Sequence, residues 1–345
     1  MSKQELGQFY TTNYEYILQG LTIPNGTECI IEPFAGNGDL IEFVKAAEID
    51  AHIEHYDIDP QLPDTTAQDT IQNPPDYKNK FIITNPPYLA RNKSNNKTLY
   101  NKYGVNDLYK CFMCEIIKQG CLGGILIIPL NFWSSIRDAD VELRRRFVLK
   151  FNVIRLNIFE EQVFDDTTTT VCSFQFEQRR QKIPHKMPIF IYPTEKQIFA
   201  VLAKSNNYTI GGSIYNLHIP DPPRYVVNRL TSKNIDSDHT FIKVKCIDDN
   251  QTSMISVRYM PDDVFIDTTP KLSARTYATL VITPPIDEET QKKLCRKFNS
   301  FLRAYRNKYH SLFLSNYRES KDIARKRISF SLVYHIVSHL LEKYF

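Results

Sequence analysis

The feature that most constrains the fold is an alternation of short apolar runs with amphipathic stretches in the first half of the chain. Strands that alternate with helices build a mostly parallel sheet with helices packed on its faces. The expected strands are residues 29–32, 52–57, 81–85, 124–129, 153–159 and 169–176, and the expected helices are residues 40–47, 107–119 and 139–149. Because the last two strands follow each other without a helix, we expect the sheet to end in an antiparallel pair.

The alternation stops a little beyond the middle of the chain, and the second half has a different character. Residues 206–283 are rich in Pro, Asn, Asp and short strand-like pieces, and a helix is expected to begin near Asp287, where apolar side chains recur at helical spacing. A second helix is expected over residues 329–344. A chain of 345 residues suggests about two domains, so we place one over residues 1–190 and the other over residues 191–345.

Charge is unevenly distributed along the chain. The whole sequence carries 43 Lys and Arg against 39 Asp and Glu, a net charge of +4. Residues 290–345 hold 13 of these basic residues and three of the acidic ones, so the end of the chain carries +10 and the rest −6. A basic surface of this kind is typical of proteins that bind a polyanion. It is equally typical of a helix with a solvated basic face, and charge alone leaves both interpretations open.

Several classes of protein are excluded by what the sequence lacks. The N-terminal segment contains no apolar signal region, and no apolar run approaches the roughly 20 residues that a membrane span requires. The seven cysteines are scattered, and the close pair Cys111 and Cys114 has no second pair with which to complete a zinc site. We therefore expect a soluble protein with reduced thiols and no bound metal, in a cytoplasmic or nuclear setting.

A glycine-containing loop follows the first expected strand. Residues 32–39 read Glu-Pro-Phe-Ala-Gly-Asn-Gly-Asp, with Gly36 and Gly38 at the turn into a helix. Glycine lets the backbone pass close to a ligand, and a helix N-terminus offers free N–H groups to an anion. A dinucleotide-binding site would need glycine in place of Ile41, and a P-loop would need Gly-Lys followed by Ser or Thr. The sequence therefore disfavours both kinds of nucleotide site. A tight turn without a ligand is the alternative.

Two acidic residues follow at the expected ends of neighbouring strands. Asp57 ends the second strand, where a carboxylate can accept hydrogen bonds from the hydroxyls of a ribose. Ile58 beside it could cover the face of an adenine ring, and Asp69 could accept a hydrogen bond from an exocyclic amine. An acid at a strand end is as often simply a helix cap, so this reading depends on the neighbouring motifs.

The run Asn85-Pro86-Pro87-Tyr88, at the end of the strand expected over residues 81–85, carries the clearest chemical signal. Two prolines cannot continue a central strand, so the chain leaves the sheet there in a stiff, extended conformation. The Asn85 side-chain oxygen and the Pro86 carbonyl can then converge on one amino group, draw its lone pair out of conjugation and aim it at an electrophile. Tyr88 offers a flat ring on which a base can stack. The alternative is a turn that the prolines merely stiffen. It is disfavoured because the motif follows the glycine loop and Asp57 in the chain.

In their order and spacing, these motifs resemble those of the DNA amino-methyltransferases of restriction-modification systems, which use S-adenosylmethionine. The resemblance covers roughly residues 7–176. It implies that Asn85, Pro86, Pro87 and Tyr88 form the catalytic motif, in the form that the family associates with N6 of adenine, and that Phe164 packs against a flipped base. The cofactor-binding residues that it implies are Tyr10, Thr11, Thr12, Glu32, Phe34, Ala35, Gly36, Gly38, Asp57, Ile58, Asp69 and Asn85.

The resemblance also implies a fold and an activity. The fold is a Rossmann-like methyltransferase fold, a mostly parallel seven-stranded sheet with an antiparallel final strand, followed by an α+β target-recognition domain. The cofactor motif precedes the catalytic motif, as in the family's γ arrangement. The activity is methyl transfer from S-adenosylmethionine to N6 of an adenine flipped out of double-stranded DNA, in the cytoplasm of a bacterium or of the host cell of a virus. A cognate restriction endonuclease acting on the same site is a further candidate partner, and no membrane is expected.

Contacts with DNA are expected from basic residues outside the catalytic motifs. Arg144, in a run of three arginines, is one candidate for a phosphate contact. The C-terminal candidates for phosphate or base-edge contacts are Asn316, Arg318, Lys321, Arg325 and Arg327. For each of these residues a solvated face is the alternative.

Other proteins share the Asn-Pro-Pro-Tyr motif. Some methylate a glutamine amide in release factors, and others methylate N2 of guanine in RNA. The release-factor enzymes carry a helical substrate domain before the glycine loop, whereas 31 residues precede Glu32 here, so DNA is favoured. A catalytically silent nucleic-acid-binding homologue is a third reading, which the intact motif, both glycines and Asp57 disfavour.

Overall fold

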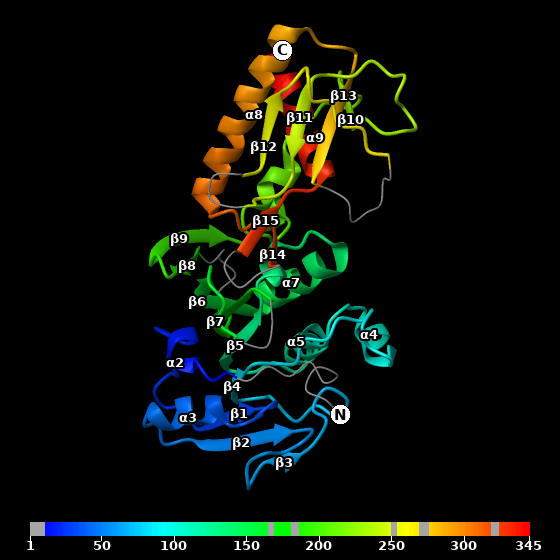
Figure 1. Ribbon diagram of the computed structural model, residues 1–345. Helices are drawn as coiled ribbons and strands as arrows, with labels where there is room; N and C mark the ends of the chain where they lie inside the picture. Colours follow the sequence, from blue (N-terminus) through cyan, green and yellow to red (C-terminus); the bar gives the residue numbers. More distant parts are fainter. Residues whose placement is uncertain (1–10, 165–168, 181–185, 250–253, 269–275, 319–323) are drawn as a thin grey trace. The chain divides into compact units, whose positions relative to one another are not determined.

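The computed structural model describes residues 11–164, 169–180, 186–249, 254–268, 276–318 and 324–345. The chain divides into two compact units, each with its own sheet (Figure 1). The first unit consists of residues 1–209 with residues 318–322, and the second of residues 210–317 with residues 323–345.

A nine-stranded sheet forms the centre of the first unit, in the order β3-β2-β1-β4-β5-β7-β6-β8-β9. Its strands are β1 (Cys29–Glu32), β2 (His52–Asp57), β3 (Thr66–Ala67), β4 (Phe81–Thr84), β5 (Gly123–Pro129), β6 (Phe151–Phe159), β7 (Val171–Gln178), β8 (Lys186–Tyr192) and β9 (Lys196–Val201). Strands β3, β2, β1, β4 and β5 are parallel, and β7 lies antiparallel between β5 and β6. The first seven strands therefore form the mostly parallel sheet with a reversed final strand that the sequence predicts, and the Rossmann-like fold class is confirmed.

Helices connect these strands and cover the sheet. They are α2 (Tyr14–Ile17), α3 (Asp39–Ala46), α4 (Thr98–Tyr103), α5 (Leu108–Gln119), α6 (Asn131–Ser134) and α7 (Asp138–Lys150). Every residue of β4 and β5 is buried, which explains why these strands are continuous apolar runs rather than alternating ones. Among the residues described, no helix has both the length and the apolar composition to cross a lipid bilayer.

Strands β8 and β9 extend the sheet beyond the seven strands expected from the sequence. β8 pairs in parallel with β6, and β9 returns antiparallel beside β8. The first unit therefore continues to residue 209 instead of ending near residue 190. The physical reason lies in β8, along which buried and less buried residues alternate, so that it covers its apolar side chains only by joining the sheet.

A four-stranded antiparallel sheet, in the order β10-β13-β11-β12, forms the second unit together with two long helices. Its elements are η2 (Gly212–Asn216), β10 (Val226–Arg229), β11 (Ile242–Lys245), β12 (Ser256–Tyr259), β13 (Tyr277–Thr283), α8 (Glu288–Tyr309) and α9 (Phe330–Tyr344). The short helix η1 (Lys204–Asn206) belongs to the first unit, and β14 (Ser315–Arg318) and β15 (Ala324–Arg327) form a separate pair of strands. Both long helices begin where the sequence predicts, because the side chains of Asp287 and Ser329 cap their first turns. The second unit thus has α+β architecture, and its role in target recognition stays a prediction.

Candidate active site

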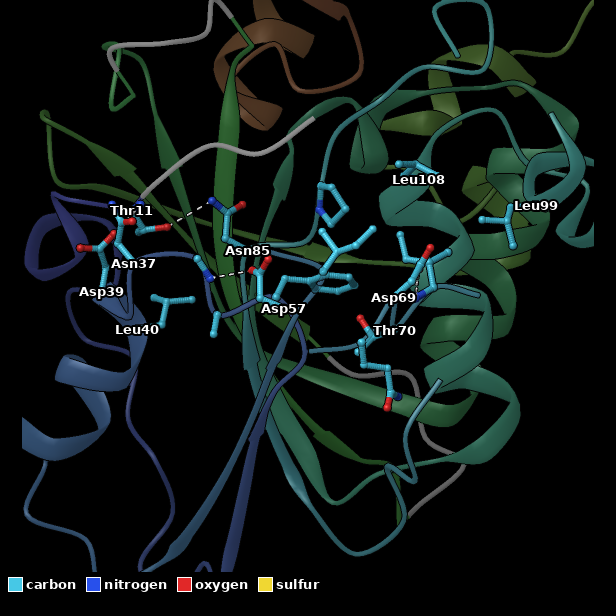
Figure 2. A pocket seen from close by; sticks show the side chains of 17 residues that line it. Thr11, Asn37, Asp39, Leu40, Asp57, Asp69, Thr70, Asn85, Leu99 and Leu108 are labelled. Atoms are coloured by element: carbon cyan, nitrogen blue, oxygen red, sulfur yellow. Dashed lines mark hydrogen bonds between the residues drawn. The ribbon is translucent and has the colours of Figure 1, made fainter. Parts of the chain in front are cut away.

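A pocket opens at the carboxyl ends of β1, β2 and β4, where the strand order reverses. The chain passes from β1 outward to β2 and β3, and then from β4 outward to β5 on the other side. Loops that leave such a point diverge in opposite directions and leave a crevice between them. The pocket encloses about 930 Å³ of empty space, with the solvent at its mouth included (Figure 2).

Nine residues predicted from the sequence line this pocket. They come from the segment before α2, the glycine loop, the end of β2, the loop after β3 and the loop after β4. They are Thr11, Phe34, Ala35, Gly36, Asp57, Ile58, Asp69, Asn85 and Pro87. The fold therefore gathers the predicted cofactor residues and the catalytic asparagine around one cavity.

The glycine loop is held to the end of β2 by the carboxylate of Asp57. Asp57 accepts the backbone N–H of Gly36 at 2.8 Å and that of Asp59 at 2.9 Å. Gly38, which precedes α3, has a φ of 89°, and a Cβ there would lie 2.6 Å from a methyl carbon of Leu62. The left-handed backbone conformation therefore favours glycine at position 38, and a larger residue would also force the Leu62 side chain to shift.

The part of the pocket beyond Asp57 has an exposed apolar wall and a carboxylate with a spare acceptor. Ile58 exposes 44% of its surface although it is apolar. Asp69 Oδ1 accepts the backbone N–H groups of Ile71 and Gln72 at 3.1 and 3.0 Å, while its Oδ2 has no partner among the described residues. The Asp69 side chain is therefore held in place and keeps one oxygen for a ligand (Figure 2).

Asn85 lies directly after β4, on the side of the pocket where Thr11 and Asp39 lie (Figure 2). Its Nδ2 donates to the Thr11 hydroxyl at 3.1 Å, and the Thr11 N–H donates to Asp39 Oδ2 at 3.1 Å. The Tyr88 hydroxyl lies within hydrogen-bonding distance of two acceptors, Asn85 Oδ1 and the Ile127 carbonyl, the latter at 2.7 Å. A hydroxyl donates one proton, so Tyr88 can serve only one of these acceptors at a time.

The remaining predicted residues lie outside the pocket wall. Tyr88 is only 9% exposed, and its ring packs edge to face on Tyr109 with the centroids 6.0 Å apart. Phe164 is 5% exposed. The others that do not line the pocket are Thr12, Glu32, Gly38 and Pro86, and Tyr10 lies outside the described residues. The roles proposed for these residues stay predictions.

Glu32, at the end of β1, is buried behind the glycine loop. Its Oε1 accepts the N–H of Phe34 at 2.9 Å and the hydroxyl of Thr84 at 2.5 Å, which joins β1 to β4 where the pocket opens. Its Oε2 is buried and has no hydrogen-bonding partner among the described residues. Burial, with a smaller contribution from the charge of Asp57, raises the pKa of Glu32 to about 8 against the lowering effect of the two hydrogen bonds. The carboxyl is therefore mostly protonated at neutral pH.

This raised pKa predicts how the stability of the protein depends on pH. An unfolded chain releases the glutamate proton near pH 4.3, about its ordinary pKa, whereas the folded protein holds the Glu32 proton to about pH 8. Between these values the folded state binds more protons, so the free energy of unfolding falls as the pH rises, by up to about 1.4 kcal/mol per pH unit. We expect Glu32→Gln to lack this part of the slope. Urea unfolding of both proteins between pH 5 and 8 measures it, and parallel profiles would contradict the prediction.

Arg144, predicted to contact DNA, is a buried structural residue of α7. Its side chain has no exposed surface. The guanidinium donates to the carbonyls of Phe132, Ser135 and Tyr208 and to the hydroxyl of Thr209, at distances of 2.6–2.7 Å. Because these groups occupy its donors and no surface is left for a phosphate, the prediction that Arg144 binds DNA is wrong. One side of this helix faces the core, and a run of three arginines does not reveal which of them lies on that side.

The C-terminal candidates for DNA contact are described only in part. Arg325 and Arg327 are half-buried residues of β15. Lys321 lies outside the described residues, as do the side chains of Asn316 and Arg318. A contact between these residues and DNA stays a prediction.

The pocket wall also contains residues that the motifs did not single out. They are Asn37, Asp39, Leu40, Gln68, Thr70, Ile71, Leu99 and Leu108. The first six are neighbours of the glycine loop or of Asp69, so the motifs themselves could have indicated them. Leu99 carries no such signal, because it belongs to α4 and reaches the pocket only when the long connection between β4 and β5 folds.

Comparison with known proteins yields sequence relatives for the first unit. Residues 31–164 match the family model of the Eco57I restriction-modification methylase. The modification methylase CviBIII of Paramecium bursaria Chlorella virus NC1A is 26% identical over 161 residues, which cover 42% of this chain and 41% of that protein. The chain thus spans less than half the length of this curated relative.

Two solved structures are similar at low sequence identity. The methyltransferase subunit of a type I restriction-modification system from Streptococcus thermophilus has 11% identity and a TM-score of 0.39, over 59% of this chain and 50% of that chain. A DrdV–DNA complex has 13% identity and a TM-score of 0.44, over 71% of this chain and 35% of that chain.

The family match covers all of the residues that line the pocket except Thr11. Residues 31–164 include the glycine loop, both acids and the Asn-Pro-Pro-Tyr motif. Over these residues the chain is similar in sequence to the Eco57I restriction-modification methylases, which confirms the resemblance to restriction-modification methyltransferases that its motifs predict.

Proposed function

We propose that this protein is a site-specific DNA methyltransferase that transfers a methyl group from S-adenosylmethionine to N6 of an adenine flipped out of the duplex. The observation that carries the proposal is the position of Asn85, which shares one pocket with the glycine loop, Asp57 and Asp69. This pocket combines carboxylates suited to a nucleoside with an acceptor suited to an amino group. The sequence similarity to Eco57I methylases over residues 31–164 supports the same activity.

The side chains of the pocket wall fit the chemistry of S-adenosylmethionine. Asp57 would accept hydrogen bonds from the ribose hydroxyls, and Asp69 Oδ2 would accept one from the adenine amine. Ile58 would cover a face of the adenine ring, which would remove its exposed apolar surface from water. Thr11 and the glycine loop would hold the methionine part. When bound, the cofactor supplies an electrophilic methyl group.

The catalytic loop would orient the amine of the substrate. Asn85 Oδ1 and the Pro86 carbonyl accept its two hydrogens, which turns the nitrogen lone pair out of conjugation with the ring. Asn85 Oδ1 becomes available for this when the Tyr88 hydroxyl donates to the Ile127 carbonyl instead. Positioning supplies most of the acceleration, because the methyl donor is already activated and needs no strong base.

The target base has to leave the duplex to reach this pocket. Flipping a base costs a few kcal/mol, and stacking on aromatic side chains returns roughly 1–3 kcal/mol per base. Tyr88 and Phe164 are the proposed stacking residues. Both rings are buried in the structure, so a base can stack on them only after their neighbours move.

Two substitutions distinguish the contribution of the Tyr88 ring from that of its hydroxyl. We expect Tyr88→Ala to raise the KM for DNA about tenfold, because it removes stacking worth roughly 1–3 kcal/mol, and to lower turnover less than loss of Asn85 does. Tyr88→Phe keeps the ring, so its KM is expected to stay near that of the parent. Steady-state kinetics with plasmid DNA measure both. An equal KM for the two variants would show that the ring does not hold the base.

Methylation mapping tests the proposed function as a whole. The protein is incubated with unmethylated plasmid and S-adenosylmethionine, and modified bases are located by sequencing. The expected result is N6-methyladenine at one short recurring sequence. Unmodified plasmid contradicts the proposal, and methyl groups on N4 of cytosine contradict its choice of base.

The alternative substrates predict different products. An RNA methyltransferase would transfer labelled methyl groups to bulk RNA, and a glutamine methyltransferase would transfer them to a release factor. A silent homologue would transfer none. Binding of S-adenosylmethionine raises the melting temperature of a protein with a working cofactor site, so an unchanged melting temperature at saturating cofactor would support the silent reading.

A further inference from the structure

The segment between the catalytic motif and α5, residues 89–107, is predominantly basic. It includes Arg91, Lys93, Lys97 and Lys102, together with five asparagines, and its one acidic residue is Asp107, directly before α5. The chain up to residue 289 carries a net charge of −6, so this concentration of positive charge directly after the catalytic motif is unusual for its surroundings. The chemistry proposed for the active site uses none of these four charges.

The structure leaves these charges uncompensated. The side chains of all four basic residues are exposed, and none of them forms an ion pair within the part of the chain that the structure describes. Arg145 of α7, whose side chain is 41% exposed, is by contrast paired with Glu142 at 2.7 Å. Arg91 donates to the side-chain oxygen of Asn101 at 3.0 Å, which orients its guanidinium without neutralising it. Like charges held close together repel one another, and a bound anion relieves this repulsion.

A second pocket lies against this segment and has a cationic wall. It encloses about 660 Å³, with the solvent at its mouth included, and its wall includes Arg91, Tyr100, Asn101, Asn106 and Arg137. The acid in the wall, Asp140, is paired at 2.5 Å with the buried Lys110, so its charge is already offset. The guanidinium groups of Arg91 and Arg137 therefore give the pocket its net positive charge.

The asparagines of this wall add hydrogen-bond donors. Asn101 and Asn106 use their side-chain oxygens to accept from Arg91 and Lys110, which leaves their NH₂ groups as donors. Arginine guanidinium groups bind phosphate oxygens through two parallel hydrogen bonds, and the amide NH₂ groups add further donors. The second pocket is thus suited to a phosphate group rather than to an apolar ligand or a cation.

Helix α4 holds the second pocket beside the active site. Leu99 lines the pocket that contains Asn85, and the next residue, Tyr100, lines the second pocket. The Tyr100 hydroxyl donates at 3.0 Å to the carbonyl of Leu89, the residue that follows the catalytic motif. The N–H of Leu108 donates to the same carbonyl at 3.2 Å. The two pockets are therefore separated by one helix, a distance on the order of 10 Å.

We propose that this segment and the second pocket bind phosphate groups of the DNA strand on either side of the flipped adenine. The inference rests on the proposed function, because it takes DNA as the substrate. A flipped nucleotide stays joined to its strand through a phosphate on each side, so backbone phosphates lie within about one nucleotide of the active site. Contacts of this kind position the strand without reading its sequence.

The double variant Arg91→Ala/Arg137→Ala tests the proposal. Its binding to a labelled duplex is measured by fluorescence anisotropy over a series of salt concentrations. We expect the affinity at about 50 mM salt to fall at least tenfold, and the slope of log K against log salt to become shallower by about two, since each phosphate contact contributes about 0.9. The Kd for S-adenosylmethionine, measured by calorimetry, is expected to stay within twofold of the parent value.

Two control variants isolate the charges from other effects. Arg91→Lys/Arg137→Lys keeps both charges and is expected to retain the salt slope. Lys196→Ala/Lys204→Ala removes two exposed charges at and just after β9, five strands from β4 or roughly 24 Å across the sheet, well beyond the Debye length of about 8 Å. This control is expected to bind DNA with the parent affinity and slope.

The outcomes separate this inference from the proposed function. If the parent methylates plasmid DNA and Arg91→Ala/Arg137→Ala keeps the parent affinity and slope, the phosphate contact is refuted and the proposed function stands. If Lys196→Ala/Lys204→Ala lowers the slope as much as the test variant does, binding depends on total charge and the second pocket has no special role. If the parent neither binds nor methylates DNA, the proposed function fails, and the phosphate contact fails with it.

Discussion

Asn85→Ala is expected to lower the rate of methyl transfer at least a hundredfold and to leave the Kd for S-adenosylmethionine nearly unchanged. Asn85 Oδ1 is the acceptor that would orient the substrate amine, and removing one preorganised hydrogen-bonding group from an active site typically lowers the rate by about 10²–10³. In the proposed cofactor site, Asp57, Asp69 and the glycine loop would make most of the contacts with S-adenosylmethionine, and the substitution leaves them in place. Single-turnover transfer of a labelled methyl group to plasmid DNA measures the first effect, and calorimetry measures the second.

Two further variants test the acceptor and the donor of the Asn85 side chain separately. Asn85→Asp keeps an acceptor oxygen and loses the Nδ2 hydrogen bond to Thr11, whereas Thr11→Val removes the partner of that bond. We expect both to retain more activity than Asn85→Ala. If Asn85→Ala still transferred methyl groups at more than a few per cent of the parent rate, Asn85 would not be the residue that orients the amine.

The second large effect is on stability and concerns Arg144. In Arg144→Met an apolar side chain of similar length replaces a guanidinium that donates to three carbonyls and a hydroxyl in the interior of the first unit. A buried acceptor left without a donor costs about 1–3 kcal/mol, so the free energy of unfolding is expected to fall by roughly 3 kcal/mol or more. Urea unfolding, followed through the transition of the first unit, measures this change.

The adjacent arginine provides a matched control. Arg145 lies on the exposed side of the same helix and is paired with Glu142 at the surface. Exposed ion pairs contribute about 0–1 kcal/mol, so Arg145→Ala should change stability little. A stable Arg144→Met protein with weakened DNA affinity would overturn the structural role of Arg144 and restore it as a DNA contact.

Much of the first unit could be predicted from its sequence because the signals are local. The predicted ranges of the first two strands, residues 29–32 and 52–57, coincide with β1 and β2. Strands β4 and β5, which are buried throughout, have to be apolar at successive positions, and residues such as Gly and Pro permit the turns at which the chain leaves a strand. The starts of α8 and α9 were also predictable from a local signal, because the residue before each helix has a side chain that caps its first turn.

The candidate site could be predicted for a related reason. Gly36, Asp57 and Asn85 each follow a strand of a parallel sheet, and the carboxyl ends of such strands lie at one edge. Strand order therefore converts residues far apart in the sequence into neighbours around one pocket. Leu99 reaches the same pocket from a helix, and no local pattern marks it.

The sequence by itself determined the alternation of strands and helices, the order of the motifs and the chemistry that Asn85 can perform, because backbone restrictions and side-chain functional groups belong to each residue. Only the tertiary structure decided that β8 and β9 join the sheet, that Arg144 is buried, and that Arg91 and its basic neighbours form no ion pair with any residue that the structure describes. Strand pairing, burial and ion pairing depend on which residues meet across the fold. The same basic side chain can therefore be a structural donor in the core or an unpaired charge beside the active site, depending on where the fold places it.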